Sequence, residues 1–186
     1  NQMLWEKKLV EEWLLRFVFR HPAHNVRFTF PEHTVDSFKM VKVWSKEWDT
    51  LSCYFTPNVL DSMQGIIHYD TLINDSTRYS LKFRETKPKQ GKKDRFMKVT
   101  PNLRGKSLTP GDDFILRFPE PIIKVIPYDT LRFEKLDEFG MKYGLSIDIN
   151  DTLEYTINLP DSVFFSVRGK VNDTLRTIEI CADSHF

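Results

Sequence analysis

Along most of this chain, apolar and polar residues alternate with a period of two. In "WLLRFVFR" (residues 13–20), Leu15, Phe17 and Phe19 fall on one face, because successive side chains of a strand point to opposite sides. "VRFTFP" (26–31) follows the same pattern. "HPAHN" separates the two stretches, since proline cannot donate to a strand ladder. The pattern predicts two strands.

Residues 38–55 predict a β-hairpin. "FKMVKVW" and "DTLSCYF" are rich in β-branched and aromatic residues, and the polar "SKE" lies between them. Further strands are predicted at "GIIHYDTL", "RYSLKF", "RFMKV", "DFILRF", "DTLRFEKL", "GLSIDI", "TLEYTINL", "SVFFSVRG" and "TLRTIEI". Because helical periodicity is almost absent between them, the predicted class is mostly β, with antiparallel strands packed as sandwiches.

Two segments depart from this alternation. Trp5, Leu9 and Trp13 recur every four residues, which predicts a short N-terminal helix. "ETKPKQGKKDR" contains no apolar residue and is rich in Lys. We therefore expect an N-terminal β-sandwich unit at residues 1–86 (the short helix, then strands), a Lys-rich linker or exposed loop at 87–95, and a second β-sandwich at 96–186.

Composition narrows the functional classes. The chain has 186 residues, of which 40% are hydrophobic, so it can bury a core. Lys+Arg 27 against Asp+Glu 26 gives no electrostatic reason to bind nucleic acid or an anionic membrane. No apolar run approaches the roughly 20 residues of a membrane span, and the first residues lack the pattern of a signal peptide. We expect neither a nucleic-acid partner nor a membrane span in this chain.

The triplet Asp-Thr-Leu occurs five times, and ten of the fifteen Asp residues precede Ser or Thr. Turn chemistry explains part of this excess, because an Asp side chain accepts hydrogen bonds from the backbone two residues further on. The following apolar residue then begins a strand. "INDSTRY", "INDTLEY" and "VNDTLRT" fit this interpretation, since Asn-Asp tolerates the positive φ of tight hairpin turns.

Several segments resemble the multi-domain Ig-like proteins of the Bacteroidetes cell envelope, whose modules share the bacterial Ig-like fold of S-layer-type proteins. The matching pieces are "LLRFVFRHP", "WDTLSCYFTPNVLDS", "FMKVTPN…LTPGDDFILRFPEPI" and "DSVFFSVRGKVNDTL". "LRFPEPI" resembles the opening strand of such a module, and "YTINLPDSVFFSVRG…NDT" resembles its last two strands. The resemblance implies two consecutive Ig-like units and an extracytoplasmic location, in the periplasm or at the outer-membrane surface.

The same resemblance implies a modification. Bacteroidetes O-glycosylate envelope proteins at Asp-(Ser/Thr)-apolar motifs, and exposed turns suit a bulky polar group. The acceptors would be Thr50, Ser62, Thr71, Ser76, Thr130, Thr152, Ser162 and Thr174.

We found no motif that predicts an enzyme or a cofactor. "RGKS" lacks the earlier glycine of a phosphate-binding loop. His21, His24 and His33 flank a proline turn without a zinc spacing, and the "DINDT" turn lacks the further ligands of a calcium loop. Cys53 and Cys181 are far apart and on unlike strand faces, so we expect neither a metal site nor a disulfide.

The strongest binding signal is aromatic. If the hairpin at 38–55 alternates regularly, Trp44 lies on one face with Phe38 and Met40, and Trp48 and Tyr54 can join it. Such a face can stack against sugar rings or anchor a protein, but it can equally be the hydrophobic core.

The expected function is therefore a non-enzymatic module, part of a larger protein or complex, that scaffolds or docks envelope proteins or glycans. The alternatives are a carbohydrate-binding module using Trp44, Trp48 and Tyr54, or an accessory domain of a larger envelope enzyme.

Overall fold

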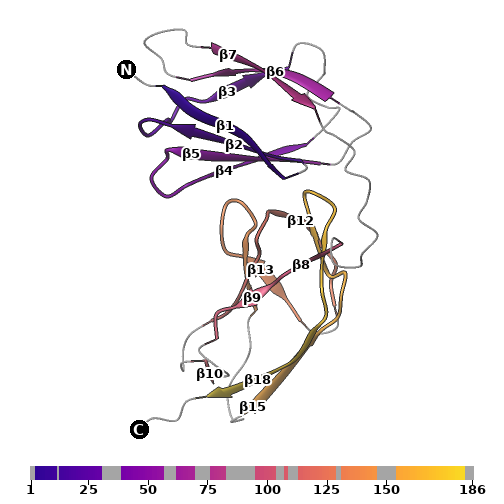
Figure 1. Ribbon diagram of the computed structural model, residues 1–186. Helices are drawn as coiled ribbons and strands as arrows, with labels where there is room; N and C mark the ends of the chain where they lie inside the picture. Colours follow the sequence, from indigo (N-terminus) through magenta and orange to yellow (C-terminus); the bar gives the residue numbers. More distant parts are fainter. Residues whose placement is uncertain are drawn as a thin grey trace. The chain divides into compact units, whose positions relative to one another are not determined.

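The computed structural model describes residues 3–11, 13–30, 39–56, 62–69, 76–82, 95–103, 107–108, 113–128, 131–145 and 154–182. The chain divides into two compact units, residues 1–90 and 91–186, and this boundary falls inside the Lys-rich segment 87–95. The described part is built of strands, arranged in several mostly antiparallel sheets (Figure 1). This agrees with the predicted mostly β class. No helix in the described ranges is long and apolar enough to cross a membrane.

Unit 1 contains two sheets. The first has the strand order β1-β2-β5-β4 and the second the order β3-β6-β7, with antiparallel pairing throughout. Their bounds are β1 Leu4–Glu11, β2 Leu14–Phe19, β3 Arg27–Thr29, β4 Met40–Trp44, β5 Thr50–Phe55, β6 Ser62–His68 and β7 Ser76–Lys82. The predicted hairpin is confirmed, since β4 and β5 pair with Trp44 opposite Leu51.

The predicted N-terminal helix is wrong, because Leu4–Glu11 forms the edge strand β1. A spacing of four residues keeps side chains on one face of a helix, but four is also a multiple of two, so the same spacing fits a strand. β1 pairs with β2 in antiparallel register, and Trp13, directly before β2, adopts a positive φ of 63°. Pairing with β2, and not the periodicity of its own sequence, makes Leu4–Glu11 a strand.

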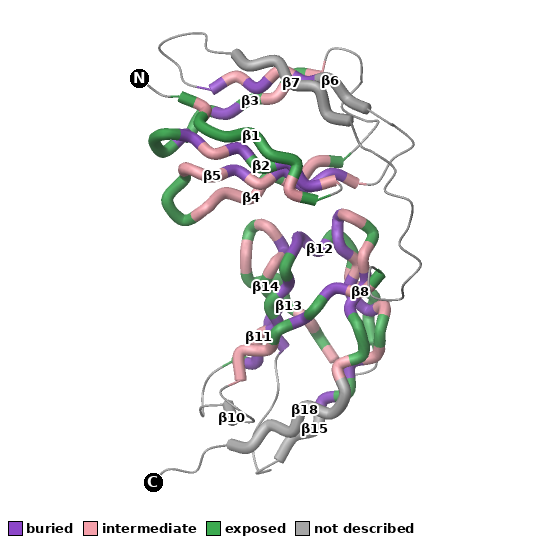
Figure 2. The backbone as a smooth tube through the Cα atoms, viewed as in Figure 1, coloured by how far each residue is buried: buried purple, intermediate pink, exposed green. Residues whose placement is uncertain are grey.

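The core of unit 1 joins the two sheets. Leu15, Phe17 and Phe19 of β2 are buried together with Leu51 of β5 and Ile67 of β6 (Figure 2). The predicted inward face of β2 is therefore confirmed. Cys53 lies in the same cluster as a free thiol, and burial raises its pKa far above the usual value.

Unit 2 contains three sheets, with the strand orders β13-β14-β11-β9, β12-β16-β17-β8 and β10-β18-β15. Two pairs are parallel, β8 with β17 and β10 with β18, and both join strands that are distant in sequence. The bounds are β8 Phe96–Met97, β9 Thr100–Pro101, β10 Ser107–Leu108, β11 Phe114–Arg117, β12 Ile122–Val125, β13 Phe133–Lys135, β14 Lys142–Leu145, β15 Glu154–Leu159, β16 Phe164–Ser166, β17 Val171–Asn172 and β18 Leu175–Ala182.

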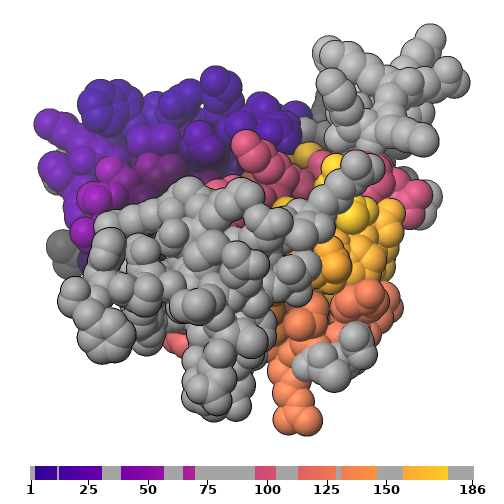
Figure 3. Space-filling model, turned by 90° about the horizontal axis from the view of Figure 1, so that it is seen from below, coloured from indigo at the N-terminus to yellow at the C-terminus, as the bar shows by residue number. Residues whose placement is uncertain are grey.

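The core of unit 2 is a separate cluster around Phe114, Leu116, Leu145 and Phe164, all almost fully buried. Phe114 and Leu116 lie on β11, where "DFILRF" predicts a strand. In contrast, β12 was not among the predicted strands, because "IIKV" has no clear alternation and exposes Ile123. The chain leaves Ile123, Ile126 and Leu136 exposed around β12 and β13, in the part of the chain drawn in orange in Figure 3.

Candidate functional site

The turn between β4 and β5 is organised around the Ser45 side chain. Its hydroxyl accepts hydrogen bonds from the backbone N–H groups of Asp49 (3.3 Å) and Thr50 (3.1 Å) and donates one to Asp49 Oδ1 (2.8 Å). The Ser45 N–H donates to the Thr50 carbonyl (2.8 Å). Ser and Asp favour such local side-chain-to-backbone bonds over regular strand pairing, so this sequence ends β4 at Trp44 and starts β5 at Thr50.

The first Asp-Thr-Leu triplet belongs to this network. The Thr50 hydroxyl donates to Asp49 Oδ1 (3.0 Å). Hydrogen bonds from Ser45 and then Thr50 lower the pKa of Asp49 below its usual value. In the triplet at 173–175, Asp173 Oδ1 accepts the N–H of Thr174 (2.8 Å). The Asp side chains thus serve turns, as predicted, but in these two triplets they accept from the next residue and not from the residue two positions on.

Trp48 occupies the last part of the turn with a left-handed backbone, at φ 59°. Its N–H donates to the Ser45 carbonyl (3.1 Å), and its carbonyl accepts the N–H of Ala23 (2.8 Å). The Phe19 N–H donates to the neighbouring Asp49 carbonyl (2.7 Å). The turn is therefore hydrogen-bonded to the segment that follows β2.

A row of aromatic rings runs from the core to this turn. It consists of Tyr69, Phe19, Trp44, Trp48 and His24, with successive centroids 5.6, 5.9, 5.5 and 5.3 Å apart. Tyr69 and Phe19 are buried, Trp44 is partly buried against the core, and Trp48 remains 42% exposed. His24 is exposed. We refer to these five residues as the aromatic row.

The structure brings Trp44 and Trp48 together but places Tyr54 elsewhere. Trp44 pairs with Leu51, whereas Tyr54 pairs with Val41 and Leu14, so Tyr54 lies on the opposite face of the sheet from Trp44. Tyr54 is also buried, at 7% exposure. His24, which sequence reasoning considered only as a metal ligand, contacts Trp48 instead. Nothing in the spacing of positions 24 and 48 signals this contact.

The predicted glycan acceptors fall in different environments. Thr50 is partly buried and its hydroxyl is engaged with Asp49, whereas Thr174 is exposed. Ser162 lies in a turn with φ 61°. Ser62 begins β6 and Ser76 begins β7. Positions 71, 130 and 152 lie outside the described residues.

The other chemical candidates yield no cluster. His21 and His24 are exposed, while His33, "RGKS" and the "DINDT" turn lie wholly or mainly outside the described residues. Among the residues that the structure describes, no group of three or more His, Cys, Asp or Glu side chains could hold a metal ion.

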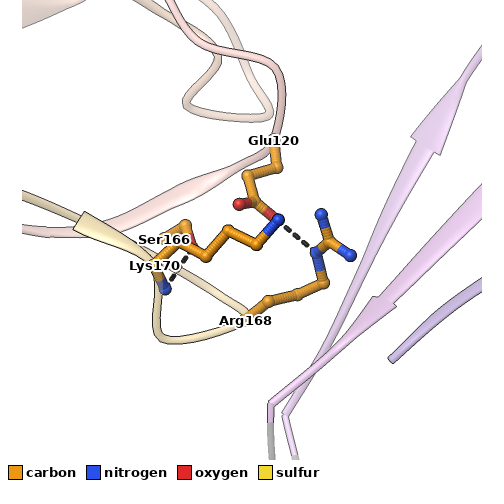
Figure 4. A network of polar contacts seen from close by, with 4 residues as sticks. All are labelled: Glu120, Ser166, Arg168 and Lys170. Atoms are coloured by element: carbon orange, nitrogen blue, oxygen red, sulfur yellow. Dashed lines mark hydrogen bonds and ion pairs between the residues drawn. The ribbon is translucent and has the colours of Figure 1, made fainter. Parts of the chain in front are cut away.

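Unit 2 contains a buried charged group that sequence reasoning missed. Glu120 is 1% exposed, and its Oε2 accepts a hydrogen bond from Nε of Arg168 (Figure 4). Figure 4 also shows the Lys170 side chain extending toward the Glu120 carboxylate, while the Lys170 N–H donates to Ser166 Oγ (3.0 Å). Glu120 Oε1 is buried without a hydrogen-bond partner in the described part of the chain. "PEP" in the sequence gives no sign of this burial.

Asn172 is a second buried polar group in unit 2. Its Oδ1 accepts the N–H groups of Val163 (2.9 Å) and Phe164 (2.7 Å), and its Nδ2 donates to the carbonyls of Pro160 (2.8 Å) and Asp173 (3.1 Å). The amide thus uses all its donors and acceptors to join β17 to the turn before β16. This arrangement serves the structure of the unit and leaves no group for a ligand.

Comparison with known proteins gives no family assignment. No protein-family model matches the chain, and no curated protein matches it. Among solved structures, the chain is similar to domains 5-6 of the S-layer protein SbsC, with a TM-score of 0.33 and 9% sequence identity, over 99% of this chain and 100% of that one.

Proposed function

We propose that this chain is a non-enzymatic extracytoplasmic module of two Ig-like β-sandwich units that docks or scaffolds cell-envelope proteins. The support is architectural: two β units in succession, each with its own apolar core, provide fixed surfaces from which partners can be held. The assignment to the envelope rests on the sequence resemblance described above.

The observation that carries the docking role is the exposure of single apolar side chains on β1, above all Trp5. Trp5 is 72% exposed and Leu9 43%, and Met3 just before the strand is 48% exposed. β1 is also the edge strand of its sheet among the described strands. Exposed tryptophan on an edge strand is typical of a surface that a protein partner covers.

A photo-crosslinking experiment tests this role. A photoreactive phenylalanine analogue at Trp5 should crosslink to a discrete envelope protein in the native host, and the same analogue at Lys98, an exposed residue of unit 2, provides the control. A Trp5→Ala variant should lose co-purification of that protein. If position 5 gives no adduct, or the same adducts as position 98, docking through β1 is rejected.

We further propose that the Asp-(Ser/Thr)-apolar motifs carry O-linked glycan in the native host, with Thr174 as an exposed acceptor. Intact-mass measurement of host-derived protein tests this. A mass equal to that of the bare polypeptide would exclude the modification.

A further inference from the structure

Trp48 is held in a backbone conformation that its side chain does not favour. For an L-residue the left-handed region costs about 1–2 kcal/mol, and Gly or Asn usually occupies such turn positions. Here the position carries an indole at φ 59°, with 42% of the residue still exposed. Bulky residues in strained conformations occur preferentially at functional sites, so this combination points to a use for the ring at the surface.

Trp13 has the same backbone conformation in a different environment. It lies directly before β2 at φ 63°, and it packs against the core of unit 1. Burial therefore offsets the strain at Trp13. At Trp48 the ring contacts Trp44 and His24 at the outer end of the aromatic row, and much of its surface stays in water.

The turn also fixes the backbone at Trp48, and the contacts with Trp44 and His24 restrict its ring. Backbone hydrogen bonds to Ser45 and Ala23 lie on either side of the residue, and the Ser45–Asp49–Thr50 network holds the turn itself. A ring that is already ordered loses little conformational entropy when a ligand binds.

A polar side chain lies against this ring. His24 is exposed, with its ring centroid 5.3 Å from that of Trp48. Lys46 and Glu47, the two residues before Trp48 in sequence, are exposed as well. Unlike Trp5, Trp48 lies in a turn and not in an edge strand, so pairing with a partner strand cannot add to a protein contact there. One aromatic ring with a few hydrogen-bonding groups is sufficient for a sugar unit.

We propose that Trp48, together with His24, forms a binding site for a neutral sugar ring. The C–H bonds on one face of a pyranose carry partial positive charge and complement the negative face of the indole. The imidazole can donate and accept hydrogen bonds with the sugar hydroxyls. This site goes beyond the docking role of β1 and does not depend on it.

Isothermal titration with cellohexaose, maltohexaose, mannohexaose and chitohexaose tests the site in the intact chain. At least one hexasaccharide should bind, and Trp48→Ala should weaken that binding about tenfold or more, as expected for loss of one stacking contact. Trp5→Ala is the matched control, because it also removes an exposed indole of unit 1 and should leave the affinity unchanged.

A second variant separates binding from folding. Trp48→Gly removes the same ring but suits the left-handed backbone, so it should unfold at a similar or higher temperature than the wild type and still fail to bind. The inference is overturned if none of the four sugars binds at about 10 mM, which corresponds to less than 3 kcal/mol of binding free energy. It is equally overturned if the Trp48 and Trp5 variants bind alike. Neither result bears on crosslinking at Trp5.

Discussion

The two units of this chain place their polar groups differently. The buried polar and charged residues among those described, Glu120, Ser166 and Asn172, all lie in unit 2. In unit 1 the described core consists of aliphatic and aromatic residues and Cys53, while the side-chain hydrogen-bond network lies in the partly exposed turn at 45–50.

In unit 2, buried polar side chains stabilise the fold. In unit 1, the hydrogen-bonded polar side chains lie in a turn that is partly exposed to solvent. In unit 2, side-chain hydrogen bonds replace backbone pairing where short strands end, as Asn172 does beside the two-residue strand β17. In unit 1, longer strands pair their own backbones, so the Ser45–Asp49 network can shape an exposed turn and its tryptophan. Four substitutions test the comparison.

The largest effect is expected for Arg168→Ala. The substitution leaves the Glu120 carboxylate buried without its Arg partner, and breaking a buried pair in this way costs about 3–5 kcal/mol. Urea unfolding monitored by circular dichroism measures this loss. Arg117→Ala, at an exposed position of β11, is the control and should change stability little. A loss below about 1 kcal/mol at Arg168 would mean that solvent or the Lys170 side chain compensates the Glu120 charge.

Asn172→Ala should cost somewhat less, about 2–4 kcal/mol. It removes four hydrogen bonds and leaves the N–H groups of Val163 and Phe164 without their acceptor. Hydrogen exchange measured by mass spectrometry should show faster exchange in the turn at 160–163, while β2 and β5 of unit 1 stay protected. Equal acceleration in both units would contradict the separate cores.

Cys53→Ser introduces a polar group where unit 1 has none. Cys53 is fully buried among aliphatic and aromatic side chains, and an unsatisfied hydroxyl there should cost about 1–3 kcal/mol. Thermal unfolding measures this cost. The native thiol supplies an independent check in a Cys181→Ser background: because burial raises its pKa, Cys53 should react with a thiol reagent at pH 8 only after unfolding. Rapid labelling of the native protein would show that the unit 1 core is open.

The smallest effect is expected for Asp49→Asn, and it should depend on pH. Because the pKa of Asp49 in the folded chain lies below its usual value of 3.8, the ionised carboxylate stabilises the fold above that value. This contribution disappears as the pH falls through the folded pKa. The variant should therefore be slightly less stable than the wild type at pH 7, with the gap closing below about pH 3.8 in parallel urea titrations. A gap that persists in acid would assign the effect to packing.

Sequence alone determined the mostly β fold class of this protein and several of its strands. The alternation in β2, β5 and β11 predicted strands, because a period of two has one structural meaning when a run is long and flanked by turn residues. At Trp5, Leu9 and Trp13, a spacing of four fitted helix and strand equally, and only pairing with β2 decided for the strand.

The candidate site depended still more on tertiary structure. The sequence identified Trp44 and Trp48 as neighbours but could not place Tyr54. The register across a turn determines which residues of the two strands share a face. Because Trp44 pairs with Leu51, Tyr54 lies on the opposite face. The contact of His24 with Trp48 and the burial of Glu120 against Arg168 join positions far apart in sequence. The periodicity of a strand determines the side of the strand on which each side chain lies. The residues that this side chain contacts are determined only by the packing of the sheets.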